Sequence, residues 1–162
     1  MAALTEAQKG ALFALWRSRL LAARTSLHAE QGAAKGGTRV DGSFRPENRG
    51  ERAAVTAQGY LAAGLAQRLA ELDDAVALLD RMRPDERARV SVGAAVLLDA
   101  GEEPTWVALL PGGDATVVVV GQERVTVLSA EAPLARALLG LEAGDAALHP
   151  TTGVELELVE VC

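Results

Sequence analysis

Two apolar stripes at helical spacing, separated by a Gly-rich polar segment, constrain the fold of this 162-residue chain most strongly. The first stripe steps by three and four residues through Phe13, Trp16, Leu20, Ala23 and Leu27. The second has the spacing of a heptad seam and consists of Leu61, Leu65, Leu69, Leu72, Val76 and Leu79. Because each stripe needs an apolar partner, the pattern predicts two long helices that pack against each other.

Local signals place the ends of the first helix. Thr5 followed by Gln8 has the pattern of a capping box, which predicts that the helix begins there. Glycines between Gly32 and Gly37 predict its end, because Gly destabilises a helix interior.

Residues 36–50 are rich in Gly and charged residues and are expected to form a loop. The second helix should start between Pro46 and Glu51, since Pro needs no donor in the first turn and carboxylates favour the positive helix end. Pro84 should mark the end of the helix or of its linker. Residues 1–83 are therefore predicted to form an antiparallel coiled-coil hairpin with its tip loop at residues 36–50.

Two helices of about 30 residues would make this hairpin about 45 Å long. Small residues in the second helix predict close approach of the helices near the loop: Ala53, Ala54, Ala57, Gly59, Ala62, Ala63 and Gly64. Such a hairpin can be a reaching arm or part of a helical bundle, and periodicity alone favours the bundle.

After Pro84 the pattern changes to short apolar or alternating runs bounded by turn residues. These runs predict strands at residues 90–98, 106–110, 117–120, 125–128, 145–149 and 154–161. Pro133 to Leu139 is expected to form one short helix that stops at Gly140. Within it, Leu134, Leu138 and Leu139 are expected in the core. Residues 84–162 are thus predicted to form a small antiparallel sheet domain, and the fold class is α+β.

Charge and composition exclude several classes of function. The net charge of −6 argues against general coating of DNA. No apolar run reaches the roughly 20 residues of a membrane span, and the N-terminus lacks the pattern of a signal peptide. A single cysteine, Cys162, is compatible with a reducing cytoplasm, where we expect the protein to be located.

Residues 1–50 contain eight Lys or Arg against four Asp or Glu, so the charge is unevenly distributed. Basic residues gather in and around the expected loop: Lys35, Arg39, Arg45, Arg49 and Arg52. This segment can be a solvated connection between helices, or a tip that meets a phosphate-bearing or metal-bearing site.

Two stretches of the chain resemble the Gre family of bacterial transcription elongation factors. The first resembles the second helix of the Gre coiled coil with its tip, through Glu47-Asn48, Glu51, Ala53-Ala54, Gln58-Gly59-Tyr60, Gly64-Leu65 and Leu69 to Leu72. The second resembles the family's FKBP-like C-terminal domain, through Ala132-Pro133-Leu134-Ala135-Arg136-Ala137-Leu138-Leu139-Gly140 and Gly144-Asp145.

The resemblance implies that bacterial RNA polymerase is the partner. The FKBP-like domain would dock at the rim of the secondary channel, and the coiled-coil tip would reach the polymerase active site. Tip carboxylates would help hold a catalytic Mg²⁺ that positions water to cleave backtracked RNA. The chain would then be an accessory factor and not an enzyme. It would be a monomer with no cofactor of its own, sharing the polymerase Mg²⁺ and touching the RNA 3′ end only indirectly.

The resemblance assigns roles to a few residues. Asp41 and Glu47 would be the catalytic carboxylates, with Glu51 as a further ligand of the shared Mg²⁺. Docking on the polymerase would use Glu131, Ala132, Pro133 and Arg136.

Two departures from the family pattern keep alternatives open. The family has Asp three residues before its Glu-Asn pair, where this chain has Phe44. Asp41 can be an ordinary loop residue and Glu47 an ordinary helix-start residue. Ala132 replaces the Ser of the family's docking element. A Gre-like modulator that inhibits the polymerase without cleavage is therefore the alternative.

A third alternative is an FKBP-like prolyl isomerase or a general interaction module. It ranks low, because residues 90–162 contain a single aromatic residue, Trp106, from which no aromatic-lined pocket can be assembled.

Overall fold

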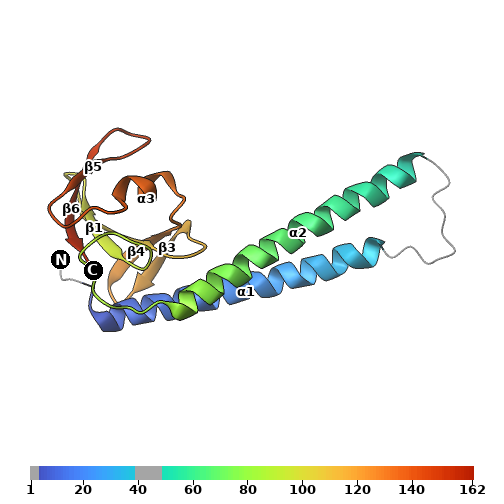
Figure 1. The fold of residues 1–162 in the computed structure, drawn as a ribbon, viewed down its shortest axis with the longest axis horizontal. Coiled ribbons are helices and arrows are strands. Elements are labelled where there is room, and N and C mark those ends of the chain that lie inside the picture. The colour runs from blue at the N-terminus through green and yellow to red at the C-terminus, as the bar shows by residue number, and fades with distance from the viewer. Residues whose placement is uncertain (1–3, 39–48) are drawn as a thin grey trace. The chain divides into compact units, whose positions relative to one another are not determined.

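The computed structural model describes residues 4–38 and 49–162 (Figure 1). Two long helices come first, α1 (Glu6–Thr38) and α2 (Arg49–Arg81). The other elements are β1 (Ala95–Asp99), β2 (Thr105–Leu109), β3 (Asp114–Val120), β4 (Glu123–Leu128), α3 (Pro133–Leu138), β5 (Ala146–Leu148) and β6 (Glu155–Val161). The predicted α+β class and order of elements are confirmed. None of the described helices is both long and apolar enough to cross a membrane.

Contacts divide the chain into two compact units. The hairpin unit is Ser18–Val76, and the sheet unit joins Met1–Arg17 to Ala77–Cys162. The first turns of α1 and the last residues of α2 therefore group with the sheet. The boundary between residues 83 and 84 stays a prediction of where a domain would end.

The capping box at the start of α1 is confirmed. The Thr5 amide donates to Gln8 Oε1 over 2.9 Å, and the Gln8 amide donates to Thr5 Oγ1 over 3.2 Å. At its other end α1 continues through the glycines to Thr38, one residue beyond the predicted end near Gly32 to Gly37. Each glycine costs a helix only about 1 kcal/mol, and neighbouring alanines are strong helix formers.

In the hairpin unit the seam follows the predicted spacing with two shifts. Leu20, Leu65 and Leu69 are buried, whereas the predicted seam residues Ala23 and Leu61 are exposed. Their neighbours Arg24 and Ala62 are half-buried in their place.

Arg24 fits this position because its aliphatic stem can pack while its charged head stays polar. Its guanidinium forms an ion pair with Asp73 of α2. A second ion pair, in the sheet unit, joins Arg17 to Asp80 with a hydrogen bond of 2.6 Å. This hydrogen bond lowers the pKa of Asp80.

The small residues of α2 do not lie where the sequence predicted. Except for half-buried Ala62, they are exposed to solvent: Ala53, Ala54, Ala57, Gly59, Ala63 and Gly64. The predicted close approach of the helices through these residues is therefore wrong. Nor do the described residues form a larger helical bundle, because α3 has only six residues.

The six strands form one sheet in the order β3-β4-β2-β1-β6-β5. All neighbours are antiparallel except β2 and β4, which are parallel, so the prediction of a purely antiparallel sheet is wrong for this pair. After β2 the chain crosses one strand position and forms β3 at the sheet edge. β4 pairs antiparallel with β3 and fills the position between β3 and β2. It therefore runs in the same direction as β2.

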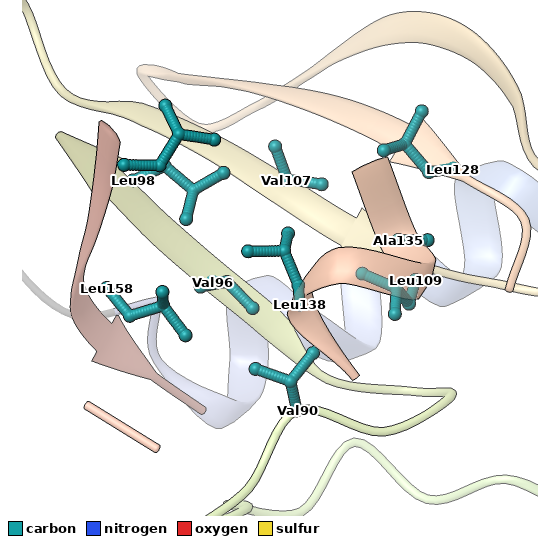
Figure 2. Packing of buried hydrophobic residues seen from close by; sticks show 10 residues of the cluster. Val90, Val96, Leu98, Val107, Leu109, Leu128, Ala135, Leu138 and Leu158 are labelled. Atoms are coloured by element: carbon teal, nitrogen blue, oxygen red, sulfur yellow. The ribbon is translucent and has the colours of Figure 1, made fainter. Parts of the chain in front are cut away.

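One sheet face is covered by α3 (Figure 2). The helix contributes Ala135 and Leu138, both with no exposed surface. They pack in a cluster with Val90, Val96, Leu98, Val107, Leu109, Leu128, Leu156 and Leu158. Burial of these side chains is the main stabilising contribution to α3, which is too short to form alone.

Within the sheet unit, the first turns of α1 are held by apolar burial and by one polar contact. Leu12 and Trp16 are almost completely buried. The Trp16 indole Nε1 donates a buried hydrogen bond of 2.9 Å to the carbonyl oxygen of Pro111, in the turn after β2. Trp16 therefore fixes the first turns of α1 to this unit.

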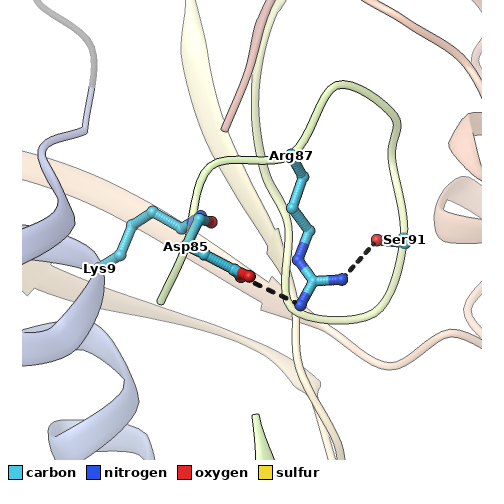
Figure 3. Close-up of polar contacts among 4 residues, drawn as sticks. All are labelled: Lys9, Asp85, Arg87 and Ser91. Atoms are coloured by element: carbon cyan, nitrogen blue, oxygen red, sulfur yellow. Dashed lines mark hydrogen bonds and ion pairs between the residues drawn. The ribbon is translucent and has the colours of Figure 1, made fainter. Parts of the chain in front are cut away.

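The segment between α2 and β1 is held by charged side chains (Figure 3). The Lys9 Nζ is buried and donates to the carbonyl oxygen of Asp85. Arg87 donates to Ser91 Oγ over 3.1 Å and pairs with the Asp85 carboxylate over 3.3 Å. Burial lowers the pKa of Lys9, because the charged ammonium is removed from water.

We predict that Trp16→Phe lowers the free energy of unfolding by about 1–2 kcal/mol, because the buried Pro111 carbonyl loses its donor. Urea unfolding measures the change. Leu15→Ala is the control, since Leu15 is exposed on the same helix and should change stability by less than about 0.5 kcal/mol. Equal stability of Trp16→Phe and wild type would show that the hydrogen bond is not formed.

Lys9 should give the unfolding free energy a characteristic pH dependence. Its pKa in the folded state lies below the usual 10.5, so the unfolded chain binds this proton more tightly. The contribution of Lys9 to stability should therefore rise with pH until about 10.5 and then level off. Unfolding measured between about pH 8 and 10.5 should show this rise in wild type relative to Lys9→Met.

Cys162 is present in both wild type and Lys9→Met, so the difference between their pH profiles reports on Lys9. Burial raises the pKa of the Cys162 thiol, and its titration therefore lowers the free energy of unfolding as the pH rises. Parallel pH profiles of wild type and Lys9→Met would contradict a buried charged amine.

Candidate functional site

The start of α3 is set by Pro133, the first residue of the helix. Ala132 is the N-cap and has no side-chain oxygen for a capping hydrogen bond. Pro133 brings no backbone N–H that would need one. The Ala132 amide donates to the Ser129 carbonyl over 3.1 Å, and its own carbonyl accepts from the Arg136 amide over 3.0 Å. Backbone contacts and Pro133 thus fix the helix start without the hydroxyl that Ser would supply.

The outward side of α3 carries the residues that the resemblance assigns to docking. Glu131, Pro133 and Arg136 are exposed, and Ala132 is half-buried. Leu139 is 38% exposed, so its predicted place in the core is wrong. Pro133 and Arg136 are three residues apart and lie on one side of the helix, and exposed Leu139 follows directly after its last residue. We call Glu131, Pro133, Arg136 and Leu139 the α3 surface.

The end of the helix explains why Leu139 faces outward. Leu139 is the C-cap and leaves the helical conformation, with φ −54° and ψ 128°. Gly140 then takes a positive φ of 86°, which L-residues rarely adopt. Leu138 is already fully buried one position earlier. A Leu-Leu-Gly sequence at a helix end therefore signals one buried and one exposed leucine, which counting apolar residues does not reveal.

Two backbone hydrogen bonds hold the far end of the α3 surface. The Gly140 amide donates to the Val90 carbonyl, and the Val90 amide donates to the Leu141 carbonyl, each over 2.8 Å. Arg89 and Glu142 form an exposed ion pair of 2.7 Å next to them. The surface is thus a fixed patch of one acid, one base and two apolar side chains. Such a patch is suited to contact with a protein surface.

Most of the predicted metal-binding tip cannot be placed. Asp41 and Glu47 lie outside the described residues. Glu51 is described and lies half-buried in the first turn of α2. In the described parts of the chain no group of three or more His, Cys, Asp or Glu is arranged to hold a metal ion. The role of the three carboxylates toward Mg²⁺ stays a prediction.

Neither of two hollows formed by described residues of the sheet unit is lined by an aromatic side chain. Trp106 is completely buried. One hollow on the unit is polar and acidic, and it is lined by Asp99, Ala100, Gly101, Gly144, Ala146, Glu155 and Glu157. A second is lined by Glu103, Pro104, Thr105, Val117, Gln122, Glu123, Arg124 and Thr126. The isomerase alternative therefore gains no support from these two hollows.

No protein-family model and no curated protein matches the chain. Solved structures that are similar include GreA factor homolog 1 (Gfh1) of Thermus thermophilus, at 19% sequence identity and a TM-score of 0.37, with 90% of this chain and 94% of that one covered. A structure of the transcription factor Gfh1 gives 19% identity and a TM-score of 0.37, covering 90% and 92%. Gfh1 of Thermus aquaticus gives 20% identity and a TM-score of 0.34, covering 89% and 92%.

The two leucines at the end of α3 give a direct test of the α3 surface. Leu138→Ala should lower the free energy of unfolding by about 2–5 kcal/mol, because it leaves a cavity in the core cluster. Leu139→Ala should change it by less than about 0.5 kcal/mol. Chemical denaturation of both variants measures the difference, and similar losses for the two would place Leu139 in the core after all.

Proposed function

We propose that the chain is a Gre-like regulator of transcription elongation that binds bacterial RNA polymerase. The sheet unit would dock through the α3 surface at the rim of the secondary channel. The coiled-coil tip would enter that channel and stimulate cleavage of backtracked RNA. Asp41 and Glu47, with Glu51 as a further ligand, would help hold the Mg²⁺ of the polymerase.

The observation that carries this proposal is the arrangement of the docking residues. Glu131, Pro133 and Arg136 were assigned by resemblance alone, and all three are exposed, Pro133 and Arg136 in α3 and Glu131 just before its N-cap. The same helix is held by burial of Ala135 and Leu138, so its outward side is available to a partner without loss of the core. The order of elements, a long helical pair followed by a sheet with one Pro-opened helix, also supports the proposal.

A second candidate function is inhibition of the polymerase without cleavage. Phe44 occupies the position where the family has its first tip carboxylate. A tip with fewer well-spaced carboxylates would hold Mg²⁺ weakly, because hard cations need several oxygen ligands. In this case the tip would act in the channel by occupying space or by its charge.

An assay with backtracked polymerase separates the two functions. A bacterial RNA polymerase is stalled in a backtracked complex with 3′-labelled RNA, and the protein is added with Mg²⁺. We predict release of short labelled RNA, with at least a tenfold loss of the rate in Asp41→Ala and Glu47→Ala. Glu30→Ala is the control, because Glu30 is an exposed carboxylate of α1 outside the predicted tip.

The affinity of the protein for the same RNA polymerase tests docking through the α3 surface. Arg136→Glu should weaken binding to the polymerase about tenfold, equal to about 1.4 kcal/mol. Arg124→Glu is its control, as an exposed arginine of β4. Slowed nucleotide addition without RNA release would favour the inhibitor, whereas no binding by wild type would reject both functions.

A further inference from the structure

Residues 53–67 of α2 are an exposed helical stretch without charge. These fifteen residues contain no Asp, Glu, Lys or Arg, although twelve of them are exposed. The following part of the same helix is charged in the usual way, with Arg68, Glu71, Asp73, Asp74, Asp80 and Arg81. Exposed helix surfaces are normally charged or polar, so the neutral stretch needs a separate explanation.

Large apolar side chains are exposed within this stretch. Tyr60 is 77% exposed and Leu61 is 57% exposed. Ala57, Tyr60, Leu61 and Gly64 are related by spacings of three, four and seven, and Ala53 lies one turn before Ala57, so all five share one side of α2. We call this side the neutral face. Exposed apolar patches of this kind mark sites of interaction more often than scattered single residues do.

Gly64 lies in the neutral face, and packing within the hairpin unit does not require a glycine at this position. A Cβ at this position would meet no atom within 4 Å beyond its own stretch of helix. Glycine in a helix interior costs about 1 kcal/mol relative to alanine. The absence of a side chain therefore serves no packing within the hairpin unit, but it leaves room for another molecule to approach the helix backbone.

The chemistry of the neutral face indicates its occupant. Nucleic acid requires Lys or Arg to meet its phosphates, and residues 53–67 contain neither. Helices that lie on membranes carry a basic polar side, which is also missing here. The remaining occupant is an uncharged protein surface.

The size of the face argues against a second copy of this chain. Fifteen helical residues extend about 22 Å, so one side of such a helix covers on the order of 200 Å². A stable complex needs roughly 800 Å² from each partner. The neutral face can therefore strengthen binding only to a partner that also binds another surface of this protein. Two linked contacts with one partner together give a higher affinity than either alone.

We propose that the neutral face packs against an uncharged protein wall of the same RNA polymerase that binds the α3 surface, with Gly64 allowing close approach. This inference rests on the proposed function. The contact would hold the hairpin by shape and apolar burial, independently of the carboxylates at its tip.

Binding of the full-length protein to immobilised RNA polymerase, measured by surface plasmon resonance, tests the proposal. Gly64→Leu should clash with the wall and Tyr60→Ala should remove apolar contact, each weakening binding tenfold or more. Gly59→Leu is the matched control. Gly59 is also exposed, and a Cβ there would likewise meet nothing within 4 Å beyond its own stretch of helix, but Gly59 lies about 140° around the helix from Gly64. It should bind within twofold of wild type.

Loss of folding would not explain weaker binding by the leucine variants. Leucine favours a helix more than glycine does, so both variants should melt at or above the wild-type temperature. If wild type binds and all variants bind equally, the neutral face is not a contact, while the proposed function stands. If wild type does not bind, both proposals fail. A wild-type dimer in sedimentation that is lost in Gly64→Leu would overturn the polymerase wall as the occupant.

Discussion

The apolar stripe of α1 is the constraint on which the other features depend, because one helix must serve two compact units. Leu12 and Trp16 are buried in the sheet unit, and Leu20 begins the seam of the hairpin unit. The stripe of α1 must therefore supply buried side chains to each unit separately, at the spacing of a 3.6-residue repeat. The ion pairs Arg17–Asp80 and Arg24–Asp73 flank this transition and tie α1 to α2 on either side of it.

Much of the fold could be predicted because its signals are local. Thr5 and Gln8 form the capping box that their spacing indicates, and alternating runs became the six strands. Non-local features were missed. The parallel pairing of β2 with β4 depends on where β3 lies, which no short stretch of sequence encodes. The half-buried place of Arg24 depends on Asp73, which is far away in the chain.

For the candidate site, the sequence indicated the residues that the resemblance assigns to docking but not the whole α3 surface. Pro133 marks a helix start by its own chemistry, whereas the exposure of Leu139 follows from the turn at Gly140. The neutral face was missed for a related reason. Ala57 and Gly64 look like residues of a tight helix interface, and their sequence spacing does not say that the neighbouring helix lies on another side. The roles of Asp41 and Glu47 stay predictions from resemblance.

The division of the chain has a consequence for how such proteins can be altered. Residues Ser18–Val76 are an insertion within the sheet unit, which is built from segments on both sides of it. Removing one heptad from each helix would keep both seams in phase and leave the sheet unit's contacts unchanged. The length of the hairpin can therefore change without a change in the stability of the unit that carries it.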